Sequence, residues 1–183
     1  MTHSIETSAE AVLQQSYAAA RQSASASACI VALHIGAQQC GIAVGSGSLP
    51  DLVKLCPLGS ERTAQQYFKT TPPTPRALEN AIQLVEDVVM PLRAVIPREA
   101  QLFSMDAGIR EIALLAGAAP SEPLHLSLEA MERVFNRLAA VVEGSSAVYQ
   151  GLPESNHFAA TLLILREFMH HLQFAHLLVL HAS

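Results

Sequence analysis

The chain has 183 residues, of which 50% are hydrophobic and 15% charged, as expected of an ordered protein that buries much of its surface. This length suits a single core, so we expect residues 1–183 to form one domain. The formal net charge of −5 and the scattering of the 11 basic residues argue against nucleic acid or an anionic membrane surface as the partner.

The first third of the chain predicts one helix followed by strands. Residues 7–22 consist largely of helix formers. Two β-branched runs, CIVALHI and CGIAVG, are separated by GAQQ and predict a hairpin over residues 29–45, and DLVKLCP predicts a third strand at 51–57. His34 shares a strand face with Ile30 and Ala32. That face should be largely buried, so we expect a hydrogen-bonded histidine rather than a ligand.

The middle of the chain predicts a long helix and a short strand. Residues 76–96 carry apolar side chains at three- and four-residue steps, with Thr74 and Pro75 as the start and Pro91 as a kink or end. Glu79, Glu86 and Asp87 should lie on the solvated face of this helix. A strand at Gln101–Met105 and a helix over residues 109–117 follow.

The last third of the chain predicts two helices. Ser127 opens an amphipathic helix that Gly144 ends. Residues 154–180 predict a long helix that is apolar around most of its circumference, so this helix must be central or covered by a partner. Because strands and helices do not alternate regularly, we expect an α+β fold. It would consist of a small, mostly antiparallel sheet of three to five strands, several helices and a long buried C-terminal helix.

Polar residues form one stripe along the predicted C-terminal helix. Glu167 lies one helical turn from His170 and His171, and glutamate and histidine at such spacings can share a metal ion. Glu167, His170 and His171 are therefore candidate metal ligands. The alternative is that they form, with Arg166 and Gln173, the helix's solvent edge or a polar seam between subunits.

Two further sites have both a functional and a structural interpretation. Asp106 lies between a predicted strand and a predicted helix, where α/β proteins place catalytic carboxylates and where an ordinary N-cap also belongs. The sequence GSGS at residues 45–48 could bind a phosphorylated metabolite. It lacks both the lysine and the following helix of a phosphate loop.

The N-terminus and the apolar segments indicate a cytoplasmic location. MTHSIETSAE has neither a basic start nor an apolar core, so we expect no secretory signal. The apolar stretches near the C-terminus are shorter than the roughly 18 to 20 residues that a membrane-spanning helix needs. The cysteines Cys29, Cys40 and Cys56 have apolar or small neighbours and fit free thiols in a reducing compartment.

Two function classes remain. The lack of a catalytic signature, the low charge and the apolar C-terminal helix favour a non-enzymatic accessory or interaction protein that self-associates through this helix as a homodimer. The alternative is a small metal-assisted hydrolase that uses Glu167, His170 and His171, with Asp106 as a further carboxylate. The sequence identifies no cofactor, small-molecule ligand or substrate.

Overall fold

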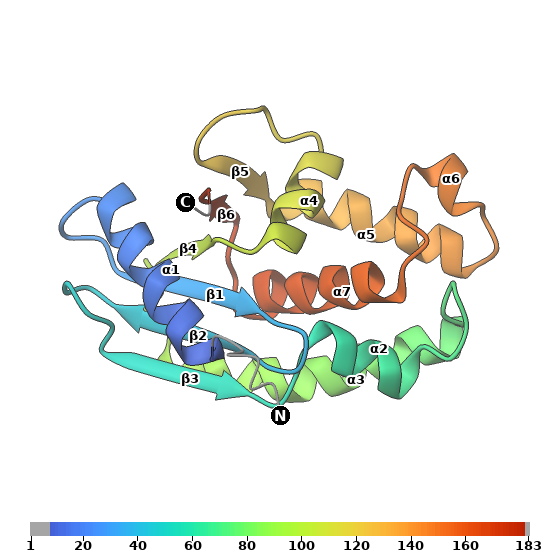
Figure 1. Cartoon of the computed structure of the whole chain (residues 1–183), viewed down its shortest axis with the longest axis horizontal. Coiled ribbons are helices and arrows are strands. Elements are labelled where there is room, and N and C mark those ends of the chain that lie inside the picture. The colour runs from blue at the N-terminus through green and yellow to red at the C-terminus, as the bar shows by residue number, and fades with distance from the viewer. Residues whose placement is uncertain (1–7, 182–183) are drawn as a thin grey trace, which may run out of the picture.

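The computed structural model describes residues 8–181, which begin with a helix and three antiparallel strands (Figure 1). Helix α1 (Ala9–Ser23) starts after Ser8, whose hydroxyl accepts the N–H of Ala11; Thr7, where the predicted helix starts, lies outside the described residues. Strands β1 (Ile30–Ile35), β2 (Cys40–Gly45) and β3 (Leu52–Cys56) follow. They confirm the predicted hairpin and the predicted third strand.

The remaining elements are mainly helices. In chain order they are α2 (Ser60–Tyr67), α3 (Pro75–Val89), the 3₁₀ helix η1 (Met90–Val95), β4 (Gln101–Ser104), α4 (Ala107–Leu115), β5 (Leu124–Ser127), α5 (Leu128–Val142), α6 (Ala147–Gln150), α7 (Asn156–His171) and β6 (His176–Val179). Thr74 caps α3 and Pro75 occupies its first turn, as predicted. Pro91 lies in η1, where the α-helical hydrogen bonding ends.

The six strands form one mixed sheet in the order β3-β2-β1-β4-β6-β5. Strand β4 is parallel to both β1 and β6, while the other neighbours are antiparallel. The prediction of a small, mostly antiparallel sheet of three to five strands is therefore wrong. The parallel pairs need long crossovers through helices, and a sequence without regular βαβ alternation does not display them.

The predicted C-terminal helix over residues 154–180 is also wrong in its extent. Helix α7 ends at His171, and Gln173 adopts a left-handed conformation with φ 62°. The chain then enters β6, which pairs with both β4 and β5. A short apolar run fits a buried strand as well as a helix, so the pattern of LLVL could not reveal the change.

Helices cover both faces of the sheet. Side chains alternate along β1, so Ile30 and Ala32 pack with α1 residues such as Leu13, while Val31 and Leu33 join the larger core with the other helices. Figure 1 shows α1 crossing β1 and β2, and α7 lying between α5 and the α2–α3 pair.

Helix α7 is the centre of the larger core. It contacts α2, α3, α4 and α5 as well as β1, so its apolar surface is covered within the same chain. The expected self-association through this helix therefore has no free apolar face to use, and a homodimer stays a prediction that needs another interface. Within residues 8–181, no helix combines the length and the apolar character required to cross a membrane.

Shortening a side chain at the centre of α7 should destabilise the whole fold. Leu163 is fully buried. Leu163→Ala should lower the free energy of unfolding by about 2–5 kcal/mol, because it removes buried methyl groups and leaves a cavity. Urea unfolding followed by circular dichroism measures the loss.

A matched control lies on α6, where Val148 is 78% exposed. Val148→Ala should change the free energy of unfolding by less than about 0.5 kcal/mol. Equal effects of the two substitutions would contradict the central position of α7.

Candidate functional site

The ends of the parallel strands β1 and β4 bring Asp106 and His34 together. Asp106 follows β4 at the start of α4, and its carboxylate binds the end of β1 rather than capping α4. One oxygen accepts the N–H of Ile35 at 2.6 Å, and the other lies 2.7 Å from Nδ1 of His34. The N–H of Asp106 donates to the hydroxyl of Ser104 at 3.1 Å. Both oxygens of the carboxylate therefore bind the end of β1, while Ser104 at the end of β4 holds the backbone of Asp106.

The carboxylate of Asp106 determines how His34 can react. Because Nδ1 faces a carboxylate, the neutral imidazole carries its hydrogen on Nδ1 and leaves Nε2 as a free base. Nε2 lies against Gly36, where a Cβ atom would approach it to 2.9 Å and the carbonyl oxygen of Gln39 to 2.7 Å. Only glycine leaves the space beside this nitrogen.

A groove of about 700 Å³ opens beside His34. It lies between the start of α1, the β1–β2 turn, the end of β3 and α2; the side chains around it include Glu10, Gln38, Gln39 and Arg62. The turn is held by α2, because the N–H groups of Ser60 and Arg62 donate to the carbonyl oxygens of Gly36 and Ala37. The groove thus has one fixed polar wall.

The sequence located Asp106 but missed its partner. Asp106 occupies the N-cap position, yet its carboxylate serves β1, so the expected capping role is replaced by a link between strands. The sequence placed His34 on a buried face as a hydrogen-bonded histidine, and the hydrogen bond is present. Its partner is 72 residues away in the chain, and no local pattern signals such a pair. A catalytic role for Asp106 stays a prediction.

A second polar cluster lies between α3 and the end of α7. Nε2 of His171 is 3.0 Å from Oε2 of Glu167 and 3.3 Å from Oε1 of Glu86. One ligand atom from each of the three residues lies within 4.8 Å of the others. The predicted stripe therefore contributes Glu167 and His171, and α3 adds Glu86, a residue expected on the solvated face of that helix.

The other residues of the stripe bind Glu132 on α5. Nδ1 of His170 lies 3.6 Å from Glu132, and Arg166 bridges Glu132 and Glu167 at 3.3 and 2.6 Å. His170 is half-exposed and takes no part in the cluster of Glu86, Glu167 and His171. Burial raises the pKa of Glu167 above its ordinary value, although Arg166 acts in the opposite direction. Metal binding by the stripe stays a prediction.

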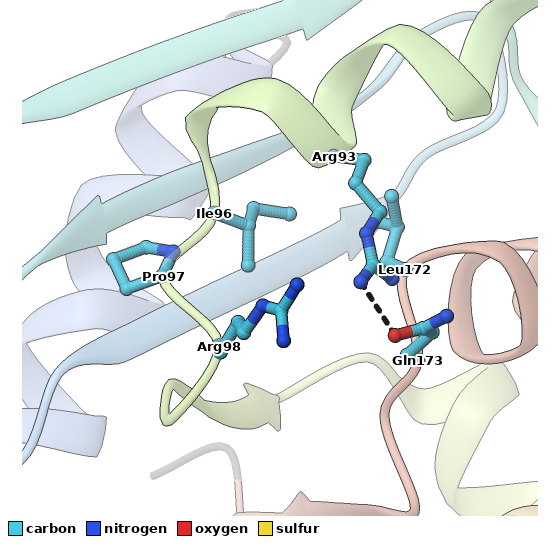
Figure 2. A pocket seen from close by; sticks show the side chains of 6 residues that line it. All are labelled: Arg93, Ile96, Pro97, Arg98, Leu172 and Gln173. Atoms are coloured by element: carbon cyan, nitrogen blue, oxygen red, sulfur yellow. Dashed lines mark hydrogen bonds between the residues drawn. The ribbon is translucent and has the colours of Figure 1, made fainter.

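A cavity of about 370 Å³ lies beside the end of α7. Figure 2 shows the side chains that line it, which are Arg93, Ile96, Pro97, Arg98, Leu172 and Gln173. Arg93 comes from η1 and donates to the carbonyl oxygen of His171 and to the side chain of Gln173. These hydrogen bonds connect η1 to the residues that follow α7, so they also position the segment between α7 and β6.

The GSGS segment lies at the opposite end of the sheet from His34, because it follows β2, which is antiparallel to β1. Helix α1 holds its carbonyl oxygens: Tyr17 donates to Gly47 at 2.9 Å, and Arg21 donates to Ser46 at 3.1 Å. These contacts account for the segment structurally, and ligand binding there stays a prediction.

Two of the free cysteines are neighbours in the sheet, and both belong to the larger core. Cys40 and Cys56 are buried partners across β2 and β3. A hydrogen bond from Cys40, together with the nearby Lys54, lowers the pKa of the Cys56 thiol to about 7. The sequence shows both cysteines, but only the strand register brings them together.

Comparison with known proteins identifies the fold. No family model and no curated protein matches the chain. Solved structures do match. The PPX-GPPA enzyme of Aquifex aeolicus is similar with a TM-score of 0.76 and 15% identity, covering 95% of this chain and 60% of its own. An exopolyphosphatase of Cytophaga hutchinsonii gives a TM-score of 0.70 and 15% identity over 96% of this chain and 60% of its own. This chain thus spans about 60% of the length of these proteins.

The fold likeness corrects the first functional interpretation. A non-catalytic accessory protein was expected because the chain lacks a catalytic signature and has an apolar C-terminal helix. The helix is buried within the chain, and the matching solved structures are described as phosphatases and exopolyphosphatases. The alternative interpretation as a hydrolase agrees better with these findings.

Removing Arg166 should expose the cost of burying Glu167. The side chain of Glu167 is 0% exposed and that of Arg166 is 22% exposed. Arg166→Met keeps an apolar stem at this position but removes the guanidinium, which lies 4.7 Å from the centre of the Phe135 ring and is the partner of the carboxylate. We expect the free energy of unfolding to fall by about 2–4 kcal/mol, measured by urea unfolding.

Arg133→Met is the matched control, since Arg133 pairs with Glu129 on the exposed face of α5. It should cost less than about 1 kcal/mol. Adding Glu167→Gln to Arg166→Met should recover part of the loss because no buried charge then remains. Equal losses for the two arginine variants would contradict the stated role of Arg166.

Proposed function

We propose that this chain is a hydrolase of phosphate esters or anhydrides, in which His34 is the general base and Asp106 its positioning residue. The observation that carries this proposal is the 2.7 Å contact between His34 Nδ1 and Asp106 at the groove beside β1 and β4. Such a contact leaves Nε2 free to take a proton, as general-base catalysis requires.

The position of the pair in the sheet supports a functional role. In sheets with parallel strands, ligands bind outside the carboxyl ends of those strands. His34 is the second-last residue of β1, just before the β1–β2 turn. Asp106 comes two residues after β4, which is parallel to β1. Both residues therefore lie at the end of the sheet where substrates are expected.

The substrate class is taken from the fold likeness. The similar solved proteins include a phosphatase and an exopolyphosphatase. By analogy with them, we propose a phosphorylated substrate for this chain. The groove offers groups that suit a phosphate: the guanidinium of Arg62 and the side-chain amides of Gln38 and Gln39. The backbone N–H groups of Ala37, Gln38 and Gln39 also donate to no backbone oxygen within residues 8–181.

The proposed reaction is hydrolysis by an activated water molecule. Nε2 of His34 takes a proton from water while the water oxygen bonds to phosphorus and the bond from phosphorus to the leaving oxygen breaks. Asp106 keeps the imidazole in the required tautomer and stabilises the imidazolium that forms, as a carboxylate does in other acid–base pairs. The leaving oxygen acquires a proton from the solvent that enters the open groove.

The predicted stripe is not part of this site. His34 faces the α1 side of the sheet, whereas Glu167 and His171 lie on α7 in the core on the other side. The hydrolase proposed here therefore differs from the metal-assisted alternative in the residues that perform the chemistry.

Substitution of His34 tests the proposal. His34→Gln should lower kcat/KM for phosphate release from polyphosphate or p-nitrophenyl phosphate by roughly 10²–10⁴-fold, because the general base is lost. Asp106→Asn should lower it by a similar factor, because an amide N–H group facing Nδ1 would place the imidazole hydrogen on Nε2 and remove the free base. His125→Gln is the control, since His125 is an exposed residue of β5. Circular dichroism confirms that each variant folds. A wild-type chain without phosphatase activity, or an equally active His34→Gln, would contradict the proposal.

Arg62 should contribute to substrate binding. Arg62→Met removes the one arginine among the residues that line the groove. We expect KM for a phosphorylated substrate to rise roughly tenfold with little change in kcat, as for the loss of one charge-assisted hydrogen bond. Arg76→Met on the exposed start of α3 provides the control. An unchanged KM in Arg62→Met would remove this residue from the site.

A further inference from the structure

We infer that Glu86, Glu167 and His171 form a binding site for one divalent transition-metal ion, with Zn²⁺ as the best fit, which joins α3 to the end of α7. This inference does not depend on the proposed hydrolase activity. It concerns a cluster in the core on the other side of the sheet from His34.

The spacing of the three side chains suits a small ion. Nitrogen and oxygen ligands of tetrahedral zinc lie at about 2.0–2.2 Å from the metal, so two ligand atoms are about 3.3–3.6 Å apart. Nε2 of His171 is 3.0 Å from Glu167 and 3.3 Å from Glu86. The two carboxylates lie within 4.8 Å of each other, and the side chain of Glu86 is 36% exposed and can adjust.

One carboxylate oxygen of Glu167 lacks a hydrogen-bond donor among the described residues. Arg166 binds Oε1 at 2.6 Å, while Oε2 has no hydrogen-bond partner within residues 8–181. His171 is close to Oε2, but its Nε2 has hydrogen-bond geometry with Glu86 instead. The whole side chain of Glu167 is 0% exposed. A buried carboxylate oxygen without a partner is costly, and it faces the point between His171 and Glu86 where an ion would lie.

The charge of the surroundings also favours a divalent cation. Three carboxylates, those of Glu86, Glu132 and Glu167, are connected through Arg166 and the two histidines. With neutral histidines, the single guanidinium leaves two negative charges uncompensated. A divalent ion would balance them. Arg166 and Glu132 would then lie outside the ligand set and orient Glu167, as hydrogen-bonding groups behind metal ligands commonly do.

The donor types narrow the choice of metal. One imidazole and two carboxylates suit Zn²⁺, Fe²⁺ or Mn²⁺ better than Mg²⁺ or Ca²⁺, which prefer oxygen ligands only. Three protein ligands leave a fourth position on the side where Glu86 and His171 are partly exposed. Solvent can reach that position.

The competing explanation is an ionic network without metal, in which a protonated His171 bridges Glu86 and Glu167. Titration of tag-free, chelator-treated full-length protein with ZnCl₂ distinguishes the two, with metal content measured by elemental analysis and affinity by calorimetry. We expect one Zn²⁺ per chain and a higher melting temperature in its presence. No stoichiometric binding at micromolar concentration would overturn the inference.

Variants locate the site. Removing groups behind metal ligands commonly weakens binding 10–100-fold, so loss of a ligand itself in Glu86→Gln or His171→Ala should weaken Zn²⁺ binding by roughly a hundredfold or more. Glu86 is partly exposed, so Glu86→Gln should fold even where a substitution of the buried Glu167 does not. His170→Ala is the matched control on the adjacent, half-exposed residue, and it should bind Zn²⁺ like the wild type. Unchanged affinity in Glu86→Gln and His171→Ala, or an equal loss in His170→Ala, would overturn the assignment.

Discussion

The burial of α7 is the constraint on which the rest of the structure depends. Eleven of its 16 residues are buried, and they are covered from several sides by α2, α3, α5 and the sheet. A helix in this position cannot turn a charged side chain toward solvent on most of its circumference. Glu167 therefore has to be compensated inside the protein, and this need accounts for Arg166 and the contacts with α3 and α5.

The packing of α7 also supports His34 and Asp106, which lie at the carboxyl ends of β1 and β4. Asp106 binds His34 and the backbone of Ile35, so the carboxylate joins β1 to the segment between β4 and α4. Helix α7 packs closely against the start of α4, where a Cβ atom on Gly108 would lie 3.4 Å from the methyl group of Thr161. The strand that carries His34 and the helix that follows Asp106 therefore both pack against α7. A side chain fixed in this way keeps one tautomer and one orientation, which is the condition for efficient proton transfer.

The predictability of each element from the sequence follows from how local its cause is. The β1–β2 hairpin, the start of α3 at Pro75 and the cap at Ser127 rest on turn and capping residues, so their patterns were sufficient. The four-residue strands β5 and β6 lack such signals, and the apolar run of β6 resembled more helix. The stripe gave Glu167 and His171, but Glu86 and the contact between His34 and Asp106 depend on tertiary packing between distant segments.

The two candidate centres lie on opposite faces of one sheet, and this separates their physical roles. His34 borders a groove beside α1, where the substrate proposed above would enter and leave. The cluster of Glu86, Glu167 and His171 lies between α3 and the end of α7, just before Arg93 fixes the residues that lead into β6. An ion there would stabilise the junction of these helices, because a ligand that binds only the folded state raises its stability. Helix α7 packs against both β1 and α4, so it connects this cluster to the strand that carries His34 and to the helix that follows Asp106.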